Sequence, residues 1–337
     1  MAFIRIINKF ILVLLFGTVV VSTEAQKTVL KFNPDGTFKI VQFTDVHFKY
    51  GNPNSDIALE RMRQVLDIEK PDLVIFTGDV IYGKPASEGM KTVLNVVAER
   101  KIPFGVVYGN HDDEQGMDRQ ELLQVIQSVP FNLTEQTEGL SGVSNYILPV
   151  KSADGSRDAL ILYCLDSHSY SSVKGVGGYD FLKFDQVDWY LKNSTAYTKV
   201  NGGKPLPSLA FFHIPLPEYS RAAAAEGAIL IGARMEPACV PQLNTGMFAA
   251  MKQSGDIMGV FAGHDHDNDY VVYWKDILLA YGRYTGGNTV YNNIQNGARV
   301  IELKEGAREF KTWIRQKDGV VNPVDFPATF QKKGDPE

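Results

Sequence analysis

Short apolar runs alternate with amphipathic stretches through the first 130 residues, and this alternation limits the fold more than any other feature of the sequence. The apolar runs predict strands at residues 38–43, 73–76 and 104–108. The amphipathic stretches predict helices at residues 57–68, 87–100 and 118–128. The run Leu73-Val-Ile-Phe76 is apolar on both faces, which favours a strand inside a sheet. Strands that alternate with helices are typical of an α/β fold.

The second half of the chain is richer in strands. They are expected at residues 146–150, 159–165, 209–212 and 258–262, with a terminal hairpin from residues 298–303 and 309–315. Residues 215–245 form a long connection with an Ala-rich start and several prolines, a length that is uncommon unless the loop is functional or disordered. No linker rich in Pro, Gly or Ser divides the chain, so we expect one domain.

The first 25 residues predict a secretory signal peptide. Arg5 and Lys9 form a short basic region, and residues 10–21 are 12 mostly apolar residues. This run is shorter than the ~20 residues that a membrane-spanning helix needs. Thr23-Glu24-Ala25 then offers small residues for a signal peptidase. We therefore expect cleavage near Ala25, a mature domain of residues 26–337 without a membrane span, and a periplasmic or secreted location.

Five of the predicted strands end in residue types that bind metal ions. The endings are Asp45-Val-His47, Gly78-Asp79, Gly109-Asn-His-Asp112, His213 and Gly263-His-Asp-His266. Five of the six histidines of the chain lie at these endings. Ligands of α/β proteins bind beyond the carboxyl ends of the strands, so the five endings could converge on one crevice. Each motif alone is weak, because a single His after a strand is more often structural.

These motifs, in this order, resemble those of the calcineurin-type metallophosphoesterases, from about residue 38 to residue 315. Gly78-Asp-Val-Ile-Tyr82 is similar to an element of the purple acid phosphatases, as are the contexts of residues 261–270 and 282–286, which resemble the small single-domain members. The resemblance implies a four-layer α/β/β/α sandwich, with a site at one edge of its two sheets. It also implies metal-assisted hydrolysis of a phosphate ester by direct attack of a metal-bridging hydroxide.

The resemblance implies two metal ions. Asp45, His47 and His266 would hold the first, Asn110, His213 and His264 the second, and Asp79 would bridge them. Nitrogen and oxygen ligands together suit Fe, Zn, Mn or Co. Two such ions can clamp an in-line displacement and lower the pKa of a bridging water.

His111 has no metal to hold, and the resemblance implies that it faces the leaving group, where it could act as a general acid. Asp112 could orient the His111 ring, or it could instead form the turn or support neighbouring residues. Tyr82 competes with His47 for a place on the first metal, because purple acid phosphatases combine a ligating Tyr with a first motif that lacks this His. If His47 binds, Tyr82 is a packed loop aromatic.

Four further features bear on the site and the surface. His168 could reach the mouth of the crevice, although it is more simply interpreted as an exposed histidine of a loop. Arg283 could bind a substrate phosphate through its planar guanidinium, or form a structural ion pair. The formal net charge of −5 argues against a stable nucleic-acid partner or an anionic membrane surface. Cys164 and Cys239 could form one disulfide in an oxidising compartment, or remain free.

Three functions remain open from the sequence. A phosphomonoesterase acting on a small phosphate ester is our first expectation, and a phosphodiesterase or nucleotide-cleaving enzyme could use the same centre. A non-catalytic metal-binding protein would be expected to lack a ligand or His111, and this chain lacks neither. The sequence leaves the natural substrate, the metal identity and the oligomeric state open.

Overall fold

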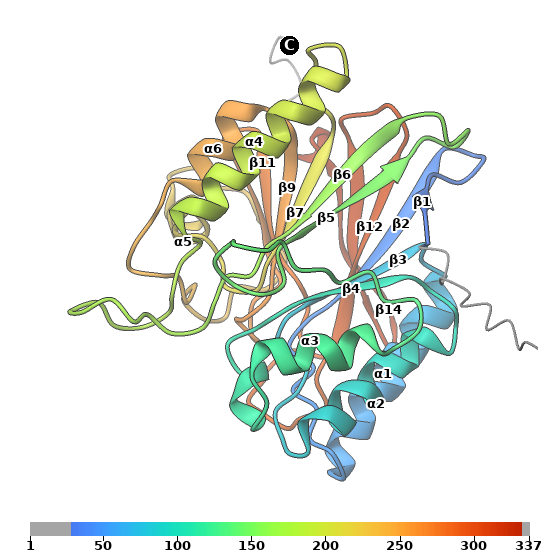
Figure 1. Cartoon of the computed structure of the whole chain (residues 1–337), viewed down its shortest axis with the longest axis vertical. Helices are drawn as coiled ribbons and strands as arrows, with labels where there is room; N and C mark the ends of the chain where they lie inside the picture. The colour runs from blue at the N-terminus through green and yellow to red at the C-terminus, as the bar shows by residue number, and fades with distance from the viewer. Residues whose placement is uncertain (1–27, 332–337) are drawn as a thin grey trace, which may run out of the picture.

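Two β-sheets lie face to face, and helices cover the outer face of each (Figure 1). The structure, a computed structural model, describes residues 28–331. The four layers, helices, sheet, sheet and helices, confirm the α/β/β/α sandwich expected from the resemblance. The predicted signal peptide lies outside the described residues.

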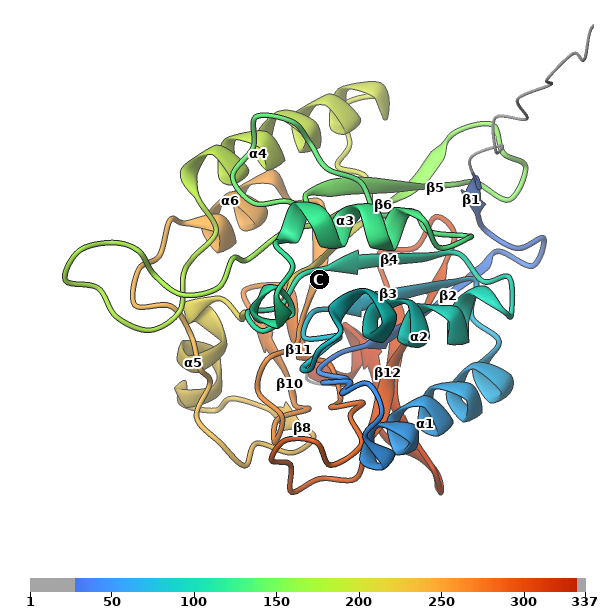
Figure 2. The ribbon, with the colours of Figure 1, turned by 60° about the horizontal axis from the view of Figure 1, so that its bottom comes forward.

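The first sheet has six strands and carries three of the predicted strand endings. Its order is β14 (Gly319–Phe326), β13 (Phe310–Gln316), β12 (Gly297–Lys304), β2 (Thr37–Phe43), β3 (Leu73–Thr77) and β4 (Phe104–Val107). The last three strands are parallel, so their carboxyl ends point the same way. The outer face is covered by α1 (Pro53–Glu69), α2 (Ala86–Ala98) and α3 (Arg119–Gln127), which lie toward the viewer in Figure 2.

Local signals explain where these three helices begin. Asn52 caps α1 by accepting a hydrogen bond from the Asn54 backbone, and Pro53 occupies the first helical position, where no backbone donor is needed. Asp118 and Glu121 form a capping box at the start of α3. The observed helices therefore match the three predicted ones to within a few residues.

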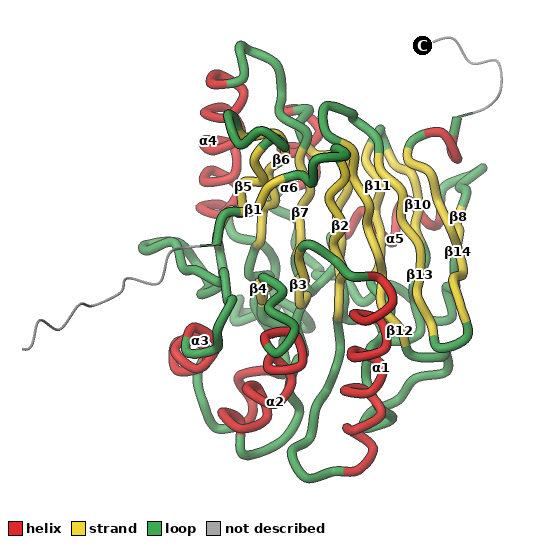
Figure 3. The backbone as a smooth tube through the Cα atoms, turned by 90° about the vertical axis from the view of Figure 1, so that its right-hand side faces the viewer, coloured by secondary structure: helices red, strands yellow, loops and turns green. Residues whose placement is uncertain are grey.

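The second sheet has eight strands and carries the other two strand endings. Its order is β1 (Leu30–Lys31), β5 (Tyr146–Lys151), β6 (Asp158–Cys164), β7 (Ser208–Phe211), β9 (Ile257–Ala262), β11 (Ile277–Tyr281), β10 (Val271–Trp274) and β8 (Leu230–Ile231). β6, β7, β9 and β11 are parallel. Its outer face packs against α4 (Phe184–Val200), α5 (Pro217–Ala224) and α6 (Met247–Ser254) (Figure 3).

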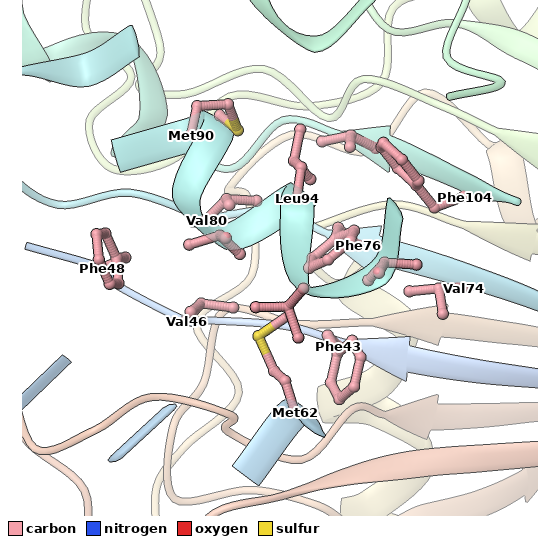
Figure 4. Close-up of a cluster of buried hydrophobic side chains, with 14 of the residues drawn as sticks. Phe43, Val46, Phe48, Met62, Val74, Phe76, Val80, Met90, Leu94 and Phe104 are labelled. Carbon is pink, nitrogen blue, oxygen red and sulfur yellow. The ribbon is translucent and has the colours of Figure 1, made fainter. Parts of the chain in front are cut away.

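Three clusters of buried apolar side chains hold the layers together. The middle cluster lies between the sheets and takes residues from both, such as Ile40 and Leu73 from one and Leu209 and Phe261 from the other. The cluster under α1 and α2 includes Val46 and Val80, which come from the loops after β2 and β3 (Figure 4). Burial of these two side chains anchors the loops that carry the candidate site.

The structure corrects several expectations for the second half of the chain. Residues 215–245 are not a structureless connection, because they contain α5 and β8. The terminal hairpin is confirmed as β12 and β13, but β14 extends it to three strands. The sequence also missed α4, of which only Gln186, Tyr190 and Ser194 are buried, so it carries little apolar pattern.

Two further expectations concern cysteines and membranes. Cys164 and Cys239 are both free thiols in the structure, and Cys164 is fully buried. Between residues 28 and 331, no helix is both long and apolar enough to cross a bilayer.

Candidate metal centre

The ends of β2, β3 and β4 in one sheet meet the ends of β7 and β9 in the other. Backbone hydrogen bonds join the loops after these strands, as between Asp45 N and Gly78 O at 3.1 Å and between Gly263 N and His213 O at 3.0 Å. A hydrogen bond joins the two sheets: the carboxylate of Asp45, after β2, accepts from the backbone N–H of His264, after β9, at 3.0 Å. The two sheets therefore share one edge at which side chains of both can meet.

The first group of donors is formed by Asp45, His47 and His266. Their ligand atoms lie within 4.8 Å of one another. Nε2 of His47 and Nε2 of His266 are 2.9 Å apart, and Oδ1 of Asp45 is 3.8 and 3.6 Å from them. The structure thus brings together the three residues predicted for the first metal.

The second group is formed by Asp79, His213 and His264, again with ligand atoms within 4.8 Å of one another. Nδ1 of His264 is 3.2 Å from Nε2 of His213. The Asn110 side chain joins this group, since its Oδ1 is 3.1 Å from the same Nε2. All four residues predicted around the second metal therefore meet.

Asp79 stands between the two groups. Its Oδ2 is 3.5 Å from Nε2 of His47 and 3.3 Å from Nε2 of His213. Its Oδ1 accepts a hydrogen bond from the His111 backbone at 2.8 Å, which fixes the plane of the carboxylate. One oxygen of Asp79 thus faces both groups, as a bridging ligand would.

The backbone at these ligands is strained. Asp45, His47, Asp79 and His264 have φ angles of 52°, 45°, 51° and 83°, in the left-handed region that residues other than glycine rarely adopt. Such conformations cost of order 1–3 kcal/mol each and persist where the surroundings impose them, often at functional sites. Four of them on the ligands of one centre indicate that the fold holds these side chains in place against a local cost.

The charge balance of the centre depends on burial. Burial lowers the pKa of His47 and of His264 well below the usual value, which keeps both rings neutral with a free lone pair. Burial also acts to lower the pKa of His213, but the carboxylates of Asp79 and Asp45 outweigh it and raise this pKa to about 9. The carboxylate of Asp79 itself stays ionised, because His213 outweighs the effect of burial and lowers its pKa.

The donor set fits two metal ions. Around an ion with bonds of about 2.0–2.1 Å, donor atoms lie roughly 3.3 Å apart, and the observed separations of 2.9–3.8 Å surround this value. His213 and His266 also turn their Nδ1 atoms away from the centre, 2.8 Å from Thr77 O and 2.9 Å from Tyr291 O. These contacts fix the tautomer that leaves Nε2 free to bind a metal.

His111 lies at the edge of the centre and is half-exposed. Its ring is 5.6 Å from that of His47, and its Nδ1 is 2.6 Å from Oε2 of Glu114, one turn further along the short 3-10 helix Asp112–Gln115. Glu114 therefore orients His111, a role that the sequence had offered to Asp112.

Asp112 has a different role. Its carboxylate is fully buried and accepts backbone hydrogen bonds from Val80 and Ile81 on one oxygen and from Asp79 and Gly109 on the other. It fastens the loop after β3 to the loop after β4. The suggestion that Asp112 orients His111 is wrong, because both of its oxygens are already committed to backbone amides.

Tyr82 packs against the centre by its ring. The ring lies edge-on to His47 at 5.2 Å and to His111 at 4.9 Å, and the Lys49 ammonium lies over it at 4.7 Å. Since His47 occupies a ligand position of the first group, this packing favours the interpretation of Tyr82 as a loop aromatic.

His168 and Arg283 are held by contacts within the protein. The ring of His168 is 2.9 Å from the Gln186 amide of α4, and its backbone carbonyl accepts from Arg119. Arg283 is 4% exposed and donates to the Asp269 carboxylate at 2.6 Å and to the Gln295 carbonyl. Arg283 thus forms the structural ion pair that was the alternative to a substrate contact, and His168 packs against α4.

Sequence reasoning missed Glu114 and a group of tyrosines around the centre. Tyr170 accepts a hydrogen bond from Asn110 Nδ2 at 3.3 Å, Tyr179 lies edge-on to His264 at 4.2 Å, and Tyr291 stacks on His266 at 4.5 Å. The only sequence signal was the presence of two tyrosines in the Gly- and Ser-rich segment 169–180.

Comparisons with known proteins agree with this geometry. The family model of the calcineurin-like phosphoesterases matches residues 38–268. The chain is 32% identical to the Arabidopsis thaliana protein named "Probable inactive purple acid phosphatase 29", over 90% of the chain and 89% of that protein. It is 35% identical to the Saccharomyces cerevisiae phosphatase DCR2, over 93% of the chain but 59% of the yeast protein.

The fold is similar to that of a dimetal phosphatase from Danio rerio. The two structures superpose with a TM-score of 0.59, covering 86% of this chain and 98% of the fish protein, at 14% sequence identity. At this identity the likeness concerns the arrangement of the layers, and the site of this chain is described by its own residues.

Proposed function

Since the chain belongs to the calcineurin-like phosphoesterase family, we propose that it hydrolyses small phosphate monoesters at the centre formed by its two donor groups. The observation that carries the proposal is the completeness of the centre. Every ligand position is filled by a residue able to bind a metal, and the seven side chains meet within a few ångströms.

The completeness of the centre also bears on a non-catalytic alternative. A plant relative carries the word "inactive" in its name. A chain that had lost catalysis while keeping a metal for structure would be expected to lack a ligand or the acid beside it. Here Asp79 faces both groups, and His111 is oriented by Glu114, so the parts needed for turnover are in place.

Each side chain has a distinct part in this proposal. Asp45, His47 and His266 would hold one ion and Asn110, His213 and His264 the other, with Asp79 between them. When bound, two ions supply Lewis-acid stabilisation of the transferring phosphoryl group and a water of lowered pKa. Mixed nitrogen and oxygen donors favour Fe, Zn, Mn or Co.

His111 would act as the general acid. Its Nδ1 donates to the Glu114 carboxylate, which orients the ring and leaves Nε2 as the nitrogen that can meet the oxygen of the leaving group. The half-exposed position of the ring suits a group that must meet a substrate and be reprotonated by solvent.

Metal analysis of purified protein tests the proposal. We expect two ions per chain and hydrolysis of an aryl phosphate monoester in preference to the matching diester. In an Asp79→Asn variant we expect loss of at least one ion and of activity, because the amide cannot bridge. Two retained ions with full activity would overturn the bridging role, and a preference for the diester would overturn the monoesterase assignment.

Export is a separate part of the proposal and rests on the N-terminal segment alone. The intact mass of protein recovered from the periplasm or medium of an expressing host should correspond to a chain that begins at Gln26.

A further inference from the structure

Four tyrosines lie around the two donor groups. We call Tyr82, Tyr170, Tyr179 and Tyr291 the aromatic collar. Each of its members lies against a predicted ligand or its neighbour: Tyr82 against His47 and His111, Tyr170 against Asn110, Tyr179 against His264, and Tyr291 against His266. The collar thus touches both groups.

Two collar members stand at the base of a projecting arm, residues 169–180, which leaves the body of the molecule before α4 (Figures 1 and 2). The arm is closed by backbone hydrogen bonds from Ser171 to Gly178 at 2.9 Å and from Asp180 to Ser169 at 3.0 Å. Tyr170 and Tyr179 form an antiparallel bridge between its two sides, and their rings stack at 5.7 Å. The arm therefore presents these two rings as one unit.

Polar contacts fix the rings while leaving large parts of them in solvent. The Tyr170 hydroxyl accepts from Asn110 Nδ2, yet the residue is 49% exposed. The Tyr291 hydroxyl donates to Glu236 at 3.0 Å, its ring stacks on His266, and the residue is 57% exposed. Rings that are exposed to solvent and also held in place beside the ligands offer a binding surface that needs little reordering when a ligand binds.

The arginines named above are already paired with carboxylates. Arg119 is paired with Asp166 and Asp113, and Arg283 with Asp269. The Lys49 ammonium lies over the Tyr82 ring. These two arginines are therefore committed within the protein, whereas a planar ring of a leaving group gains contact with any exposed tyrosine face.

We propose that the aromatic collar is the subsite for the leaving group and selects esters in which a planar ring is joined directly to the phosphate oxygen. The proposal rests on the proposed function of the centre. Three of the four collar rings lie 4.2–5.2 Å from the rings of His264, His266, His47 and His111, and the hydroxyl of the fourth, Tyr170, contacts Asn110 at 3.3 Å. Only the first few atoms of a leaving group can therefore lie between the collar and the reacting phosphorus.

Binding of two phosphonates, which cannot be hydrolysed at the carbon–phosphorus bond, tests the proposal without turnover. The affinities of phenylphosphonate and methylphosphonate for metal-loaded mature protein would be measured by calorimetry. We expect the phenyl compound to bind more tightly. Tyr170→Leu should reduce this preference roughly 2- to 12-fold, the range expected for one aromatic contact.

Tyr170→Phe is the matched control, because it removes the hydroxyl that contacts Asn110 but keeps the ring. Its preference for the phenyl compound should equal that of the wild type, even if both compounds bind more weakly. Tyr291→Leu and Tyr291→Phe repeat the comparison on the other donor group, so a Tyr170→Leu variant that fails to fold does not end the test.

The outcomes separate the collar from the proposed function. An unchanged phenyl preference in the Leu variants, or no preference in the wild type, would overturn the subsite. A preference that falls in both Leu variants and survives in both Phe variants supports it, whether or not any ester is hydrolysed. Absence of hydrolysis by protein that holds two ions would instead contradict the phosphomonoesterase proposal and leave the binding result standing.

Discussion

His111 is the centre residue whose side chain makes no contact that the fold needs. Its ring is hydrogen-bonded to Glu114 and packs edge-on against Tyr82, and its backbone, not its ring, supports Asp79. His111→Ala should therefore lower kcat roughly 10²- to 10⁴-fold while two ions stay bound. Glu114→Gln should give a smaller loss, since the amide oxygen can still accept from Nδ1 but forms a weaker hydrogen bond than the carboxylate. Steady-state kinetics and metal analysis of the same samples check both, and loss of metal from His111→Ala would show that the ring has a structural role.

Asp112 shows that a neighbour in sequence can have an unrelated function. Asp112→Asn would place an –NH₂ group against two backbone N–H donors, either those of Val80 and Ile81 or those of Asp79 and Gly109. We expect a loss of about 3 kcal/mol in the free energy of unfolding, since hydrogen bonds to a buried charge are lost.

The adjacent Asp113 is the control for this substitution. It is partly exposed and its side chain contacts only the Arg119 guanidinium, at 3.3 Å. Asp113→Asn should therefore cost less than 1 kcal/mol, as is usual for a partly exposed ion pair. Urea denaturation of metal-free protein compares the two variants, and equal losses would contradict the assigned role of Asp112.

At the scale of elements, the loop after β4 can approach the loop after β3 only because residue 109 is glycine. A Cβ at Gly109 would lie 2.0 Å from Oδ1 and 2.3 Å from N of Asp79. Gly109→Ala should displace Asp79, lower the stability by about 1–3 kcal/mol and reduce the metal content.

Gly89→Ala is the matched control. Its Cβ would meet Ile81 at an ordinary 3.4 Å inside α2, where alanine is the better helix former. Thermal unfolding and metal analysis distinguish the two substitutions. Normal metal content in Gly109→Ala would show that the loops can separate without disturbing the centre.

Arg119, the first residue of α3, joins three elements. It pairs with the buried Asp166 after β6 and donates to the Gly109 carbonyl at 2.7 Å and to the His168 carbonyl. Burial acts to raise the pKa of Asp166, but Arg119 outweighs it and holds this pKa below its usual 3.8.

A carboxyl group whose pKa is depressed in the folded state stabilises the protein above its unfolded pKa, and this contribution is lost as the pH falls through the folded value. Asp166→Asn should thus cost about 3 kcal/mol at pH 7, and the difference from the wild type should shrink below about pH 4. Urea denaturation from pH 7 to pH 3 would show this, and a constant difference would rule out ionisation of Asp166 as its source.

At the scale of the whole molecule, the apolar cluster between the sheets draws on both halves of the chain, and the metal centre ties their edges together. We therefore expect one cooperative thermal transition. Because ions that bind only the folded state stabilise it by about 2.7 kcal/mol at 100 times the dissociation constant, chelation should lower Tm by roughly 5–10 °C. Calorimetry with EDTA and with added Zn²⁺ measures the shift, and Asp79→Asn should show a much smaller one. Two separated transitions would contradict a single domain.

The sequence by itself determined the layer pattern of the first half and the residues that meet at the centre. Both are local properties: strands and helices follow from apolar spacing and caps, and each ligand follows its strand by two to four residues. Because the strands that bear these endings are parallel within each sheet, their carboxyl ends lie at the same edge, whatever path the connecting segments take.

Tertiary structure alone decided which atoms face one another and what surrounds them. His47 and His266 meet across 219 residues, Asn110 and Tyr170 across 60, and Arg283 is taken by Asp269 rather than left for a substrate. Such pairings depend on loop paths and side-chain directions that no local spacing encodes. The role of Asp112 depends on the approach of the loops after β3 and β4, and the aromatic collar depends on the meeting of the two sheets. The pairing of His111 with Glu114 is local by contrast, since the two residues are three positions apart.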